Sequence, residues 1–532
     1  MAMRLSKLLK TIYPQEIPNP FATYKITSLS CDSRRIHPNG IFIAIAGTTQ
    51  DGTQFIQDAI SKGAKVIVEN KQKAQTSRAA RIPSDVCLLR VKDTKKFLKK
   101  LSRQFYGNPS QTVKTIGITG TNGKTTVSYL IEAILKQGKK SCGVLGTINY
   151  RIGPKILPSV NTTPGIIDNQ KFLFDLAKHK VPYCVMEVSS HALDQGRVDL
   201  IDFQTAVFTN LTSDHLDYHQ NTENYFQAKA KLFLNLSAKA TAVINIDDEY
   251  GRRLVPLQLN NIGRNLSVVN GTSAPHLDKK IVAGALVAMT KSKIVTYGFK
   301  QRAAVMAEHI QTALTGLVFV LKTPRGKVKI QTRLIGYHNV YNILAAASAA
   351  YAHGVSLSDI QKAIGKFTNV PGRLEKIENK RGCHIFVDYA HTEDGLKNVL
   401  STFKEISPAR IILVFGCGGD RDKTKRPAMG QIAGELADFT IVTSDNPRSE
   451  DPQAIIEQIL TGFTKLVFKV ILDREAAIRE ALRSANEGDI VLIAGKGHED
   501  YQIFKDKTIP FDDRQVVRNI LSEKNIAKDF GK

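Results

Sequence analysis

The sequence contains little cysteine and no tryptophan. Six cysteines are spread over 532 residues, and no two of them form a CxxC pair. A disulfide framework needs cysteines that pair, and a zinc site needs closely spaced ligands, so the pattern argues against both kinds of site. Scattered single cysteines are typical of a protein that works in a reducing compartment.

Long apolar runs are also missing. No segment approaches the roughly 18 consecutive apolar residues of a membrane span, although 42% of all residues are hydrophobic. The first residues, MAMRLSKLLKTIYPQEIP, are basic but contain no apolar stretch of signal-peptide length. The sequence therefore predicts a cytoplasmic protein with substantial hydrophobic cores.

Negative charge is scarce relative to positive charge. The 49 Asp and Glu residues against 74 Lys and Arg residues give a formal net charge of +25 at pH 7. Such a charge suits nucleic acid or small polyanionic substrates. The chain has no aromatic-interleaved basic motif and no zinc-finger spacing. Its most basic stretch, residues 92–103, repeats Phe97, Leu98 and Leu101 at helical spacing, which is typical of a helix with a solvated basic face.

The chain is long enough for about three domains. We expect them at residues 1–110, 111–370 and 371–532. Short β-branched segments alternate with helical patterns in each, which predicts the α/β class with parallel sheets. The expected strands cover residues 41–45 and 65–68 in the first domain, 142–145, 183–186, 206–208 and 242–244 in the second, and 410–415, 439–442, 467–472 and 489–494 in the third.

Residues 113–126, VKTIGITGTNGKTT, have the pattern of a phosphate-binding loop. A β-branched strand runs into a glycine turn, and apolar residues at helical spacing follow, so backbone N–H groups should point at an anion. Lys124 adds a charge for the β- and γ-phosphates, and Thr125 offers a hydroxyl to Mg²⁺. Ile118 stands where the strict pattern has its first glycine, so an ordinary βα turn is the alternative. The expected nucleotide contacts are Gly120, Thr121, Asn122, Gly123, Lys124, Thr125 and Thr126.

Polar residues follow the ends of several expected strands. Because ligands of open parallel sheets bind at the carboxyl ends of the strands, these residues should converge on the phosphate loop. Glu187 is a candidate ligand of nucleotide-bound Mg²⁺, with a helix cap or an ion pair as the alternative. His215 could complete that metal site or be structural. The polar loop residues that could hold a second substrate are Thr162, Thr163, Ser189, Gln195 and Arg197.

The third domain carries Arg, Asp and Glu after three strands, which suits a zwitterionic ligand. Its GCGGDR segment does not satisfy GxGxxG, so a nicotinamide site is not expected. From chemistry alone, the sequence predicts an ATP-dependent enzyme with an anionic second substrate and a polar third one.

A series of motifs then occurs in the order found in the Mur ligases, which make bacterial peptidoglycan precursors. They are GTNGKTT, NTTP, MEVSSHAL, TNLTSDHLDYH, GYHNVYN, VPGRLE, VDYAH, GCGGDRD, DNPRSEDP and GKGHEDYQ. Together they extend over nearly the whole chain, so the sequence resembles this family throughout. The resemblance implies a small N-terminal α/β domain that binds UDP, a central parallel-sheet P-loop ATPase domain, and a Rossmann-like C-terminal domain that binds an amino acid.

The resemblance also implies an ATP- and Mg²⁺-dependent reaction. The D-glutamate γ-carboxylate of UDP-MurNAc-L-Ala-D-Glu becomes an acyl phosphate, the amine of a third amino acid attacks, and phosphate leaves. Two anions must approach each other, so charge neutralisation and positioning matter more than acid–base chemistry. The matching catalytic and metal positions are Lys124, Thr125, Glu187, His215 and Lys229. Family members carry the matching lysine as a carbamate, and the residues alone do not distinguish Lys229 from Lys231.

The remaining implied contacts fall into three groups. The further nucleotide positions are His338, Asn339 and Arg373. The UDP-muramoyl-peptide positions are Cys31, Ser33, Thr48, Thr49, Gln50, Asn161, Thr162, Thr163, Ser189, Gln195 and Arg197. The positions for the incoming amino acid are Arg421, Asp445, Asn446, Pro447, Arg448, Gly495 and Glu499.

The family divides mainly between members that add meso-diaminopimelate and members that add L-lysine. The DNPR segment resembles the diaminopimelate signature. Diaminopimelate has a second carboxylate that Arg448 can clamp, whereas lysine would leave a buried arginine unpaired. Glu499 is available for an ammonium group. Diaminopimelate is therefore the expected third residue, with L-lysine as the alternative. Without the flanking motif, the preferred interpretation of Arg448 would be an arginine in a surface turn.

Three further alternatives lie outside this assignment. Folylpolyglutamate synthetase shares the ATPase plan, but the UDP-type first domain and DNPR argue against it. A nucleic-acid-stimulated ATPase would fit the charge, but helicase-like motifs are missing. A nucleotide-binding regulatory module would bind ATP without consuming an amino acid. We expect a monomer.

Two departures from the family pattern stand out. Glu393 replaces a usual proline, which should be tolerated at a helix start. Residues 254–293 look longer than in typical members and contain no motif.

Overall fold

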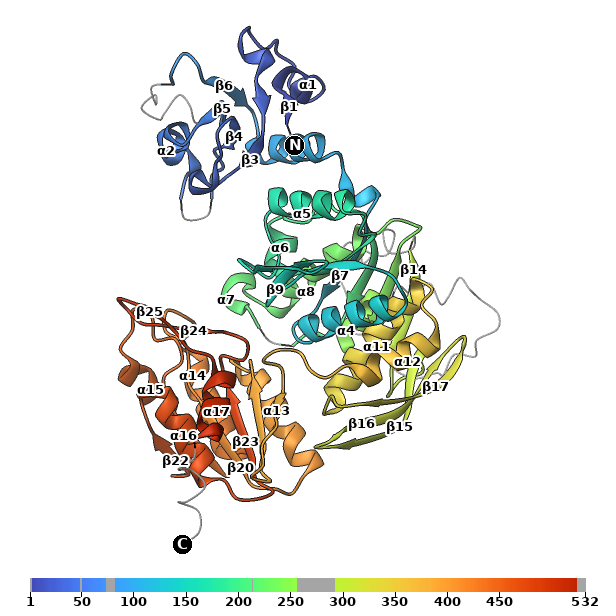
Figure 1. The fold of residues 1–532 in the computed structure, drawn as a ribbon, viewed down its shortest axis with the longest axis vertical. Coiled ribbons are helices and arrows are strands. Elements are labelled where there is room, and N and C mark those ends of the chain that lie inside the picture. Colours follow the sequence, from blue (N-terminus) through green and yellow to red (C-terminus); the bar gives the residue numbers. More distant parts are fainter. Residues whose placement is uncertain (1, 48–49, 73–81, 213, 256–291, 524–532) are drawn as a thin grey trace. The chain divides into compact units, whose positions relative to one another are not determined.

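The computed structural model describes residues 2–47, 50–72, 82–212, 214–255 and 292–523 (Figure 1). Contacts between Cα atoms divide the chain into two compact units. The first consists of Met1–Thr115, Thr163–Cys184 and His191–Phe203, and the second of Ile116–Thr162, Val185–Ser190 and Gln204–Lys532. Within the described residues, no helix is both long and apolar enough to cross a membrane.

The first unit is built on a parallel four-stranded sheet. Its order is β3 (Ser28–Ser30), β4 (Gly40–Ile43), β5 (Ala64–Asn70) and β6 (Cys87–Val91). The helices of this unit include α1 (Leu5–Leu9), α2 (Ile56–Ser61), α3 (Thr94–Tyr106) and α5 (Ile166–Lys178). Phe97, Leu98 and Leu101 of α3 are buried in the core of this unit, and its lysines are mostly exposed, as the helical spacing predicts.

The second unit begins with an eleven-stranded sheet. Its order is β10 (Lys155–Pro158), β9 (Asn149–Ile152), β8 (Cys142–Leu145), β11 (Tyr183–Glu187), β7 (Lys114–Thr119), β12 (Phe203–Phe208), β13 (Thr241–Asn245), β14 (Lys293–Gly298), β15 (Val305–Ala313), β16 (Gly316–Thr323) and β17 (Gly326–Thr332). Strands β12 to β15 pair in parallel, whereas β8–β9–β10 and β15–β16–β17 pair antiparallel. The accompanying helices include α4 (Lys124–Gln137), α7 (Leu216–His219), α8 (Thr222–Leu234), α9 (Glu249–Leu254), α11 (Tyr337–Ala352) and α12 (Leu357–Lys366).

A six-stranded sheet follows later in the chain. Its order is β18 (Glu375–Ile377), β19 (His384–Asp388), β23 (Ile490–Ala494), β20 (Ile411–Phe415), β21 (Phe439–Val442) and β22 (Phe468–Val470). Only the β18–β19 pair in this sheet is antiparallel. Its helices are α13 (Glu393–Ile406), α14 (Lys425–Leu436), α15 (Pro452–Leu460), α16 (Arg474–Ser484) and α17 (Asp513–Ser522), and a small hairpin pairs β24 (Tyr501–Ile503) with β25 (Thr508–Pro510).

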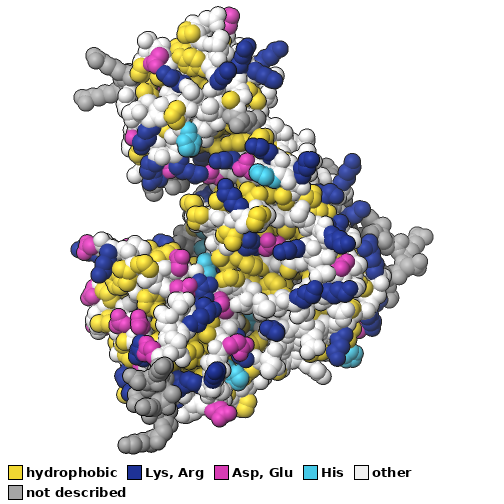
Figure 2. Space-filling view, in the orientation of Figure 1, with side chains coloured by type: hydrophobic (Ala, Val, Ile, Leu, Met, Phe, Trp, Pro, Cys, Tyr) yellow, Lys and Arg dark blue, Asp and Glu magenta, His cyan; other side chains and the backbone are white. Residues whose placement is uncertain are grey.

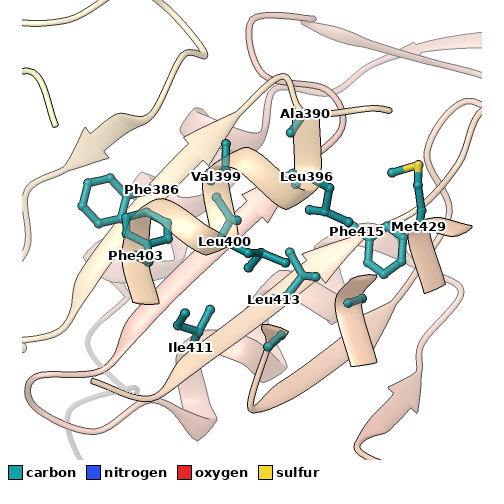
Figure 3. Packing of buried hydrophobic residues seen from close by; sticks show 14 of the residues in the cluster. Phe386, Ala390, Leu396, Val399, Leu400, Phe403, Ile411, Leu413, Phe415 and Met429 are labelled. Atoms are coloured by element: carbon teal, nitrogen blue, oxygen red, sulfur yellow. The ribbon is translucent and has the colours of Figure 1, made fainter. Parts of the chain in front are cut away.

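Alternation along these strands supplies a core on each face of the six-stranded sheet. Leu413 and Phe415 pack with Phe403 of α13 and Met429 of α14 (Figure 3). The intervening residues, such as Ile412, pack against α16 and α17 on the other face. The sequence of a strand that is buried on both faces is a continuous apolar run, and IILVF could be recognised as a strand for this reason.

The structure confirms the α/β class with parallel sheets, and most expected strands lie within two residues of the observed ones. The strand expected at residues 467–472 is shorter, because only Phe468–Val470 pair with β21. The sequence did not predict strands β14 to β17. Helix α13 begins at Glu393, as expected. The domain boundaries at residues 110 and 370 stay predictions. Nearly all of the long segment expected at 254–293 lies outside the described residues.

Candidate active site

The turn after β7 has a backbone that only glycine fits well. Gly120 has φ +148° and Gly123 has φ +86°. A Cβ atom on Gly120 would lie 1.8 Å from Oγ1 of Thr209, and one on Gly123 would lie 2.4 Å from Oδ1 of Asn342. Helix α4 starts directly afterwards at Lys124. The predicted strand, glycine turn and helix N-terminus are therefore present, and they form a phosphate-binding geometry.

Neighbouring residues hold this loop in place. The backbone N–H of Asn122 donates to Oδ1 of Asn210 at 2.9 Å, and Oγ1 of Thr209 donates to the carbonyl of Asn122 at 2.6 Å. Nζ of Lys124 donates to the carbonyls of Gly120 and Thr121, at 2.9 Å each. Burial lowers the pKa of Lys124, and Glu187 and Asp214 partly offset this effect.

Glu187 lies at the end of β11 and is fully buried. Its Oε2 accepts hydrogen bonds from Oγ1 of Thr125 and Oγ1 of Thr147, both at 2.9 Å, and its Oε1 accepts one from the N–H of Thr147 at 3.0 Å. Oγ1 of Thr147 also lies 3.0 Å from Oγ1 of Thr162. The structure thus places the predicted carboxylate and hydroxyl side by side at the start of α4.

Lys229, on α8, reaches the same loop. It is buried, with 1% of its surface exposed, and its Nζ donates to the carbonyl of Gly120 at 2.9 Å. It also lies 4.1 Å from the ring centre of Tyr225. Burial first, and then the charge of Lys124, hold the pKa of Lys229 well below its usual value. Lys231 is partly exposed, so the structure distinguishes the two lysines that the sequence did not.

His215 lies at the edge of this group. Its side chain is about half exposed, and its Nε2 is 3.5 Å from Oδ2 of Asp214. Its ring centre is 6.1 Å from that of Tyr225, the residue beneath Lys229. Across the described residues, no three His, Cys, Asp or Glu side chains cluster closely enough to hold a metal ion by themselves. Glu187 and Thr125 do offer the hard oxygen atoms that Mg²⁺ prefers, and such sites are usually completed by phosphate oxygens.

The start of α11 flanks the phosphate loop. Nδ2 of Asn342 donates to Oδ1 of Asn339 at 3.0 Å, and Nδ2 of Asn339 lies 3.1 Å from Nε2 of His338. Asn342 is the residue that Gly123 approaches closely, so this chain of side chains reaches the loop. Burial lowers the pKa of His338 to about 4, which keeps its imidazole neutral at pH 7. The guanidinium of Arg373 stacks 4.6 Å from the ring centre of Tyr389.

The residues expected to contact the UDP-muramoyl peptide lie in both units. In the first unit, Cys31 is exposed, Ser33 is buried, and Arg35 beside them pairs with both carboxylate oxygens of Asp168 at 2.7 and 3.0 Å. In the same unit, Arg197 donates to the carbonyl of Thr163 at 3.1 Å and to Oε1 of Gln195 at 2.6 and 2.9 Å.

The other expected contacts with this substrate are placed as follows. In the second unit, the carbonyl of Asn161 accepts a bond from the hydroxyl of Tyr150 at 2.6 Å, and Ser189 follows β11. In the first unit, the carbonyl oxygen of Gln50 accepts a hydrogen bond from the backbone N–H of Gly47 at 2.9 Å. Thr48 and Thr49 lie outside the described residues.

Residues that follow strands β21 and β23 of the six-stranded sheet lie close together. Nδ2 of Asn446 donates to Oε2 of Glu499 at 2.9 Å. Gly495, with φ +115°, lies against Asp445, because a Cβ atom there would be 2.7 Å from the Asp445 carboxylate. Arg448, with φ +53°, donates from its guanidinium to the carbonyl of Gly419 at 2.7 Å.

The loop after β20 completes this cluster. The carbonyl of Pro447 lies against Gly419, and Arg421 bonds to the carbonyl of Asp420 at 3.2 Å. The DNPR segment, Gly495 and Glu499 are therefore brought together as expected, whereas Arg421 belongs to the loop beside them.

Three residues in these sites were not singled out from the sequence. Thr147 follows β8 in a GT pair that has no distinctive pattern. Lys496 lies inside the GKGHEDYQ motif and is fully buried. Arg426 is fully buried and binds both oxygens of Glu450 at 2.9 Å. Hydrogen bonds from Arg426 lower the pKa of Glu450 to about 2, and Glu450 in turn holds the N–H of Asp420 at 2.6 Å.

Domain descriptions of known families match the chain in three stretches. They are "Mur ligase family, catalytic domain" at residues 25–106, "Mur ligase middle domain" at residues 118–283 and 276–350, and "Mur ligase, glutamate ligase domain" at residues 372–497. A relative from Geobacter metallireducens is 42% identical, with 97% of this chain and 98% of that protein covered. The chain belongs to the Mur ligase family.

Three relatives of this Mur ligase carry the same name. The Geobacter protein is a UDP-N-acetylmuramoyl-L-alanyl-D-glutamate–2,6-diaminopimelate ligase. A protein of the same name from Caldanaerobacter subterraneus is 41% identical, with 98% of this chain and 99% of that protein covered. A solved structure of a ligase with this name is similar with a TM-score of 0.63 and 32% identity, covering 98% of this chain and 99% of the other.

Proposed function

We propose that this Mur ligase adds meso-diaminopimelate to UDP-MurNAc-L-Ala-D-Glu at the expense of ATP. The observation that carries the proposal is its full-length similarity to ligases that are named for this reaction. The converging DNPR segment and Glu499 support it, since Arg448 and Glu499 supply the two charges that a distal carboxylate and ammonium require.

ATP binds at the loop after β7 in this proposal. Lys124 and the first N–H groups of α4 hold its β- and γ-phosphates, and His338, Asn339 and Arg373 line the rest of the nucleotide site. Glu187 and Thr125 would hold Mg²⁺, which would supply positive charge to offset that of the phosphates. Glu187 is fixed for this role by the two threonines that donate to it.

The two reacting anions meet next to two lysines. Lys124 lowers the repulsion between the γ-phosphate and the D-glutamate γ-carboxylate, which attacks phosphorus and releases ADP. The amine of diaminopimelate then attacks the acyl phosphate carbon, and phosphate leaves with the former carboxylate oxygen. In the second unit, Thr162 and Ser189 are proposed contacts of the muramoyl peptide. In the first unit, Cys31, Ser33 and Gln50 are proposed contacts of UDP.

Lys229 is proposed to carry a carbamate, as the resemblance to the Mur ligases implies. Carbon dioxide adds only to a neutral amine. The depressed pKa of Lys229 supports the modification, because it raises the neutral fraction at pH 7. A carbamate would replace the repulsion between Lys229 and Lys124 with an attraction. His215 is proposed to join that end of the metal site.

Phosphate release from ATP tests the proposal. The assay contains Mg²⁺ and UDP-MurNAc-L-Ala-D-Glu, with meso-diaminopimelate, with L-lysine, or with neither, and the product mass is measured. Turnover with diaminopimelate alone is expected. Turnover with lysine instead would retain the family and refute the specificity, and turnover with neither would refute the proposed reaction.

A further inference from the structure

Lys496 is a buried cation that the reaction outlined above does not use. None of its side chain is exposed, whereas lysine is rarely buried completely unless it is paired. It stands between Gly495 at φ +115° and Gly497 at φ +53°, directly after β23. These two left-handed residues turn the chain so sharply that the lysine side chain enters the protein.

The ammonium of Lys496 has two oxygen partners. Nζ lies 3.1 Å from Oδ1 of Asn446 and 3.3 Å from Oε2 of Glu499, and it is 5.6 Å from the ring centre of Tyr501. Both oxygens belong to residues placed at the amino-acid site. Lys496 therefore joins the DNPR segment to the turn that carries Glu499.

This contact fixes the orientation of both partners. Oδ1 of Asn446 accepts from Lys496 and from the N–H of Ile503 at 3.0 Å, so its Nδ2 faces Glu499 and donates to Oε2 at 2.9 Å. Oε2 of Glu499 thus receives two donors. Among the residues that the structure describes, none donates to Oε1 of Glu499, and 17% of the side chain is exposed.

We propose that Lys496 is a positioning residue for the incoming amino acid. Lys496 holds Oε2 of Glu499, which leaves Oε1 of Glu499 available to accept a hydrogen bond from an ammonium group of the substrate. This inference rests on the proposed function. Lys496 itself does not touch the substrate.

The test is a comparison of K496M with the wild-type protein. K496M should raise the KM for meso-diaminopimelate by about 10- to 100-fold, the usual cost of losing a charged hydrogen bond. The kcat at saturating diaminopimelate and the KM for ATP should change by less than about threefold. K496R, which retains the charge, should recover part of the loss. K469M is the matched control, because Lys469 forms a surface ion pair with Glu480 in the same sheet region, and it should behave as wild type.

A double variant separates positioning from a purely structural role. If Lys496 acts through Glu499, E499Q and E499Q/K496M should have the same KM for diaminopimelate. The inference would be overturned if the two substitutions multiplied their effects on the KM for diaminopimelate in the double variant. It would also be overturned if K496M left that KM unchanged, or if K496M raised the KM for ATP as much as the KM for diaminopimelate. The double variant also serves if K496M does not fold, because it removes the charges of both partners. No turnover by the wild-type protein would refute the proposed function instead.

Discussion

Two lysines share one acceptor in the loop after β7. Nζ of Lys124 and Nζ of Lys229 each lie 2.9 Å from the carbonyl oxygen of Gly120. Like charges this close repel each other, and burial penalises both. Burial lowers the pKa of both lysines, and the charge of Lys124 lowers the pKa of Lys229 further. The positive charge of Lys124 at the start of α4 favours an anion, and a nucleotide phosphate supplies one.

Replacing Lys124 tests that interpretation. Lys124→Ala should lower ATP turnover by about 1,000-fold or more, because charge stabilisation at the transferred phosphate is lost. Lys136→Ala is a suitable control, since Lys136 is exposed on the same helix. Phosphate release measures both variants. Wild-type activity in Lys124→Ala would contradict the nucleotide site.

Arg448 should act on one substrate only. Arg448→Ala is expected to raise the KM for meso-diaminopimelate by about 100-fold, through loss of a bidentate charge pair, with the KM for ATP nearly unchanged. Arg483→Ala, at an exposed position of the same domain, should change neither value. Equal losses for both substrates in Arg448→Ala would show that Arg448 is structural.

His338 gives a prediction on pH. Its pKa falls from 6.5 to about 4 in the folded protein, because burial disfavours the charged ring. The unfolded chain then binds a proton that the folded chain does not, so the contribution of His338 to stability is present above pH 6.5 and is lost as the pH falls towards 4. Between pH 7 and pH 5, the wild-type protein should lose more thermal stability than His338→Gln. An equal loss in both proteins would refute the pKa assignment.

At the scale of elements, the glycine turn between β7 and α4 is tightly constrained. Gly123 has a positive φ and also lies against Asn342. Gly153, in the β9–β10 hairpin, has φ +58° with nothing within 4 Å of an added Cβ. Both positions have a positive φ that would strain any other residue, but only Gly153 has space for a Cβ atom.

The matched pair Gly123→Ala and Gly153→Ala separates these effects. Gly153→Ala should cost only about 1–2 kcal/mol, the strain of a side chain in the left-handed region. Gly123→Ala should in addition displace Asn342 and weaken ATP binding by about tenfold or more. Calorimetric titration with ATP measures the affinity. Equal affinities in the two variants would mean that the loop does not hold the nucleotide.

Elements with a strong periodic signal were predictable from the sequence, and long-range contacts were not. The run before Gly120 and the run IILVF are buried on both faces and rich in β-branched residues, so their strands could be located closely. Strands β15 to β17 bury mostly alternate residues, and polar side chains interrupt the apolar ones in β15 and β17. Glu187 was placed by its position at a strand end. Thr147 and Lys496 became visible only once folding had brought their partners together.

At the scale of the whole molecule, the net charge of +25 exceeds what the reaction requires. Figure 2 shows Lys and Arg side chains spread over the visible face, with Asp and Glu between them, and not gathered into one groove. Many of these charges form exposed ion pairs, such as Lys322 and Lys327 with Glu308. Such an arrangement is typical of a solvated surface.

The protein should therefore not respond to nucleic acid. Added single-stranded RNA or double-stranded DNA is expected to leave ATP turnover unchanged at physiological salt, with or without the amino-acid substrate, because the Lys and Arg side chains seen in Figure 2 are not gathered into one groove. Polyglutamate of similar length is the control for non-specific charge effects. Stimulation by nucleic acid alone would favour the competing ATPase assignment.

The central claim is the choice of the third amino acid. The most direct measurement is the product mass from one reaction that contains ATP, Mg²⁺, UDP-MurNAc-L-Ala-D-Glu and equal concentrations of meso-diaminopimelate and L-lysine. We predict that the diaminopimelate product predominates by more than about 100-fold, because lysine leaves Arg448 without its carboxylate. A mixture of comparable amounts, or a lysine product, would contradict the account.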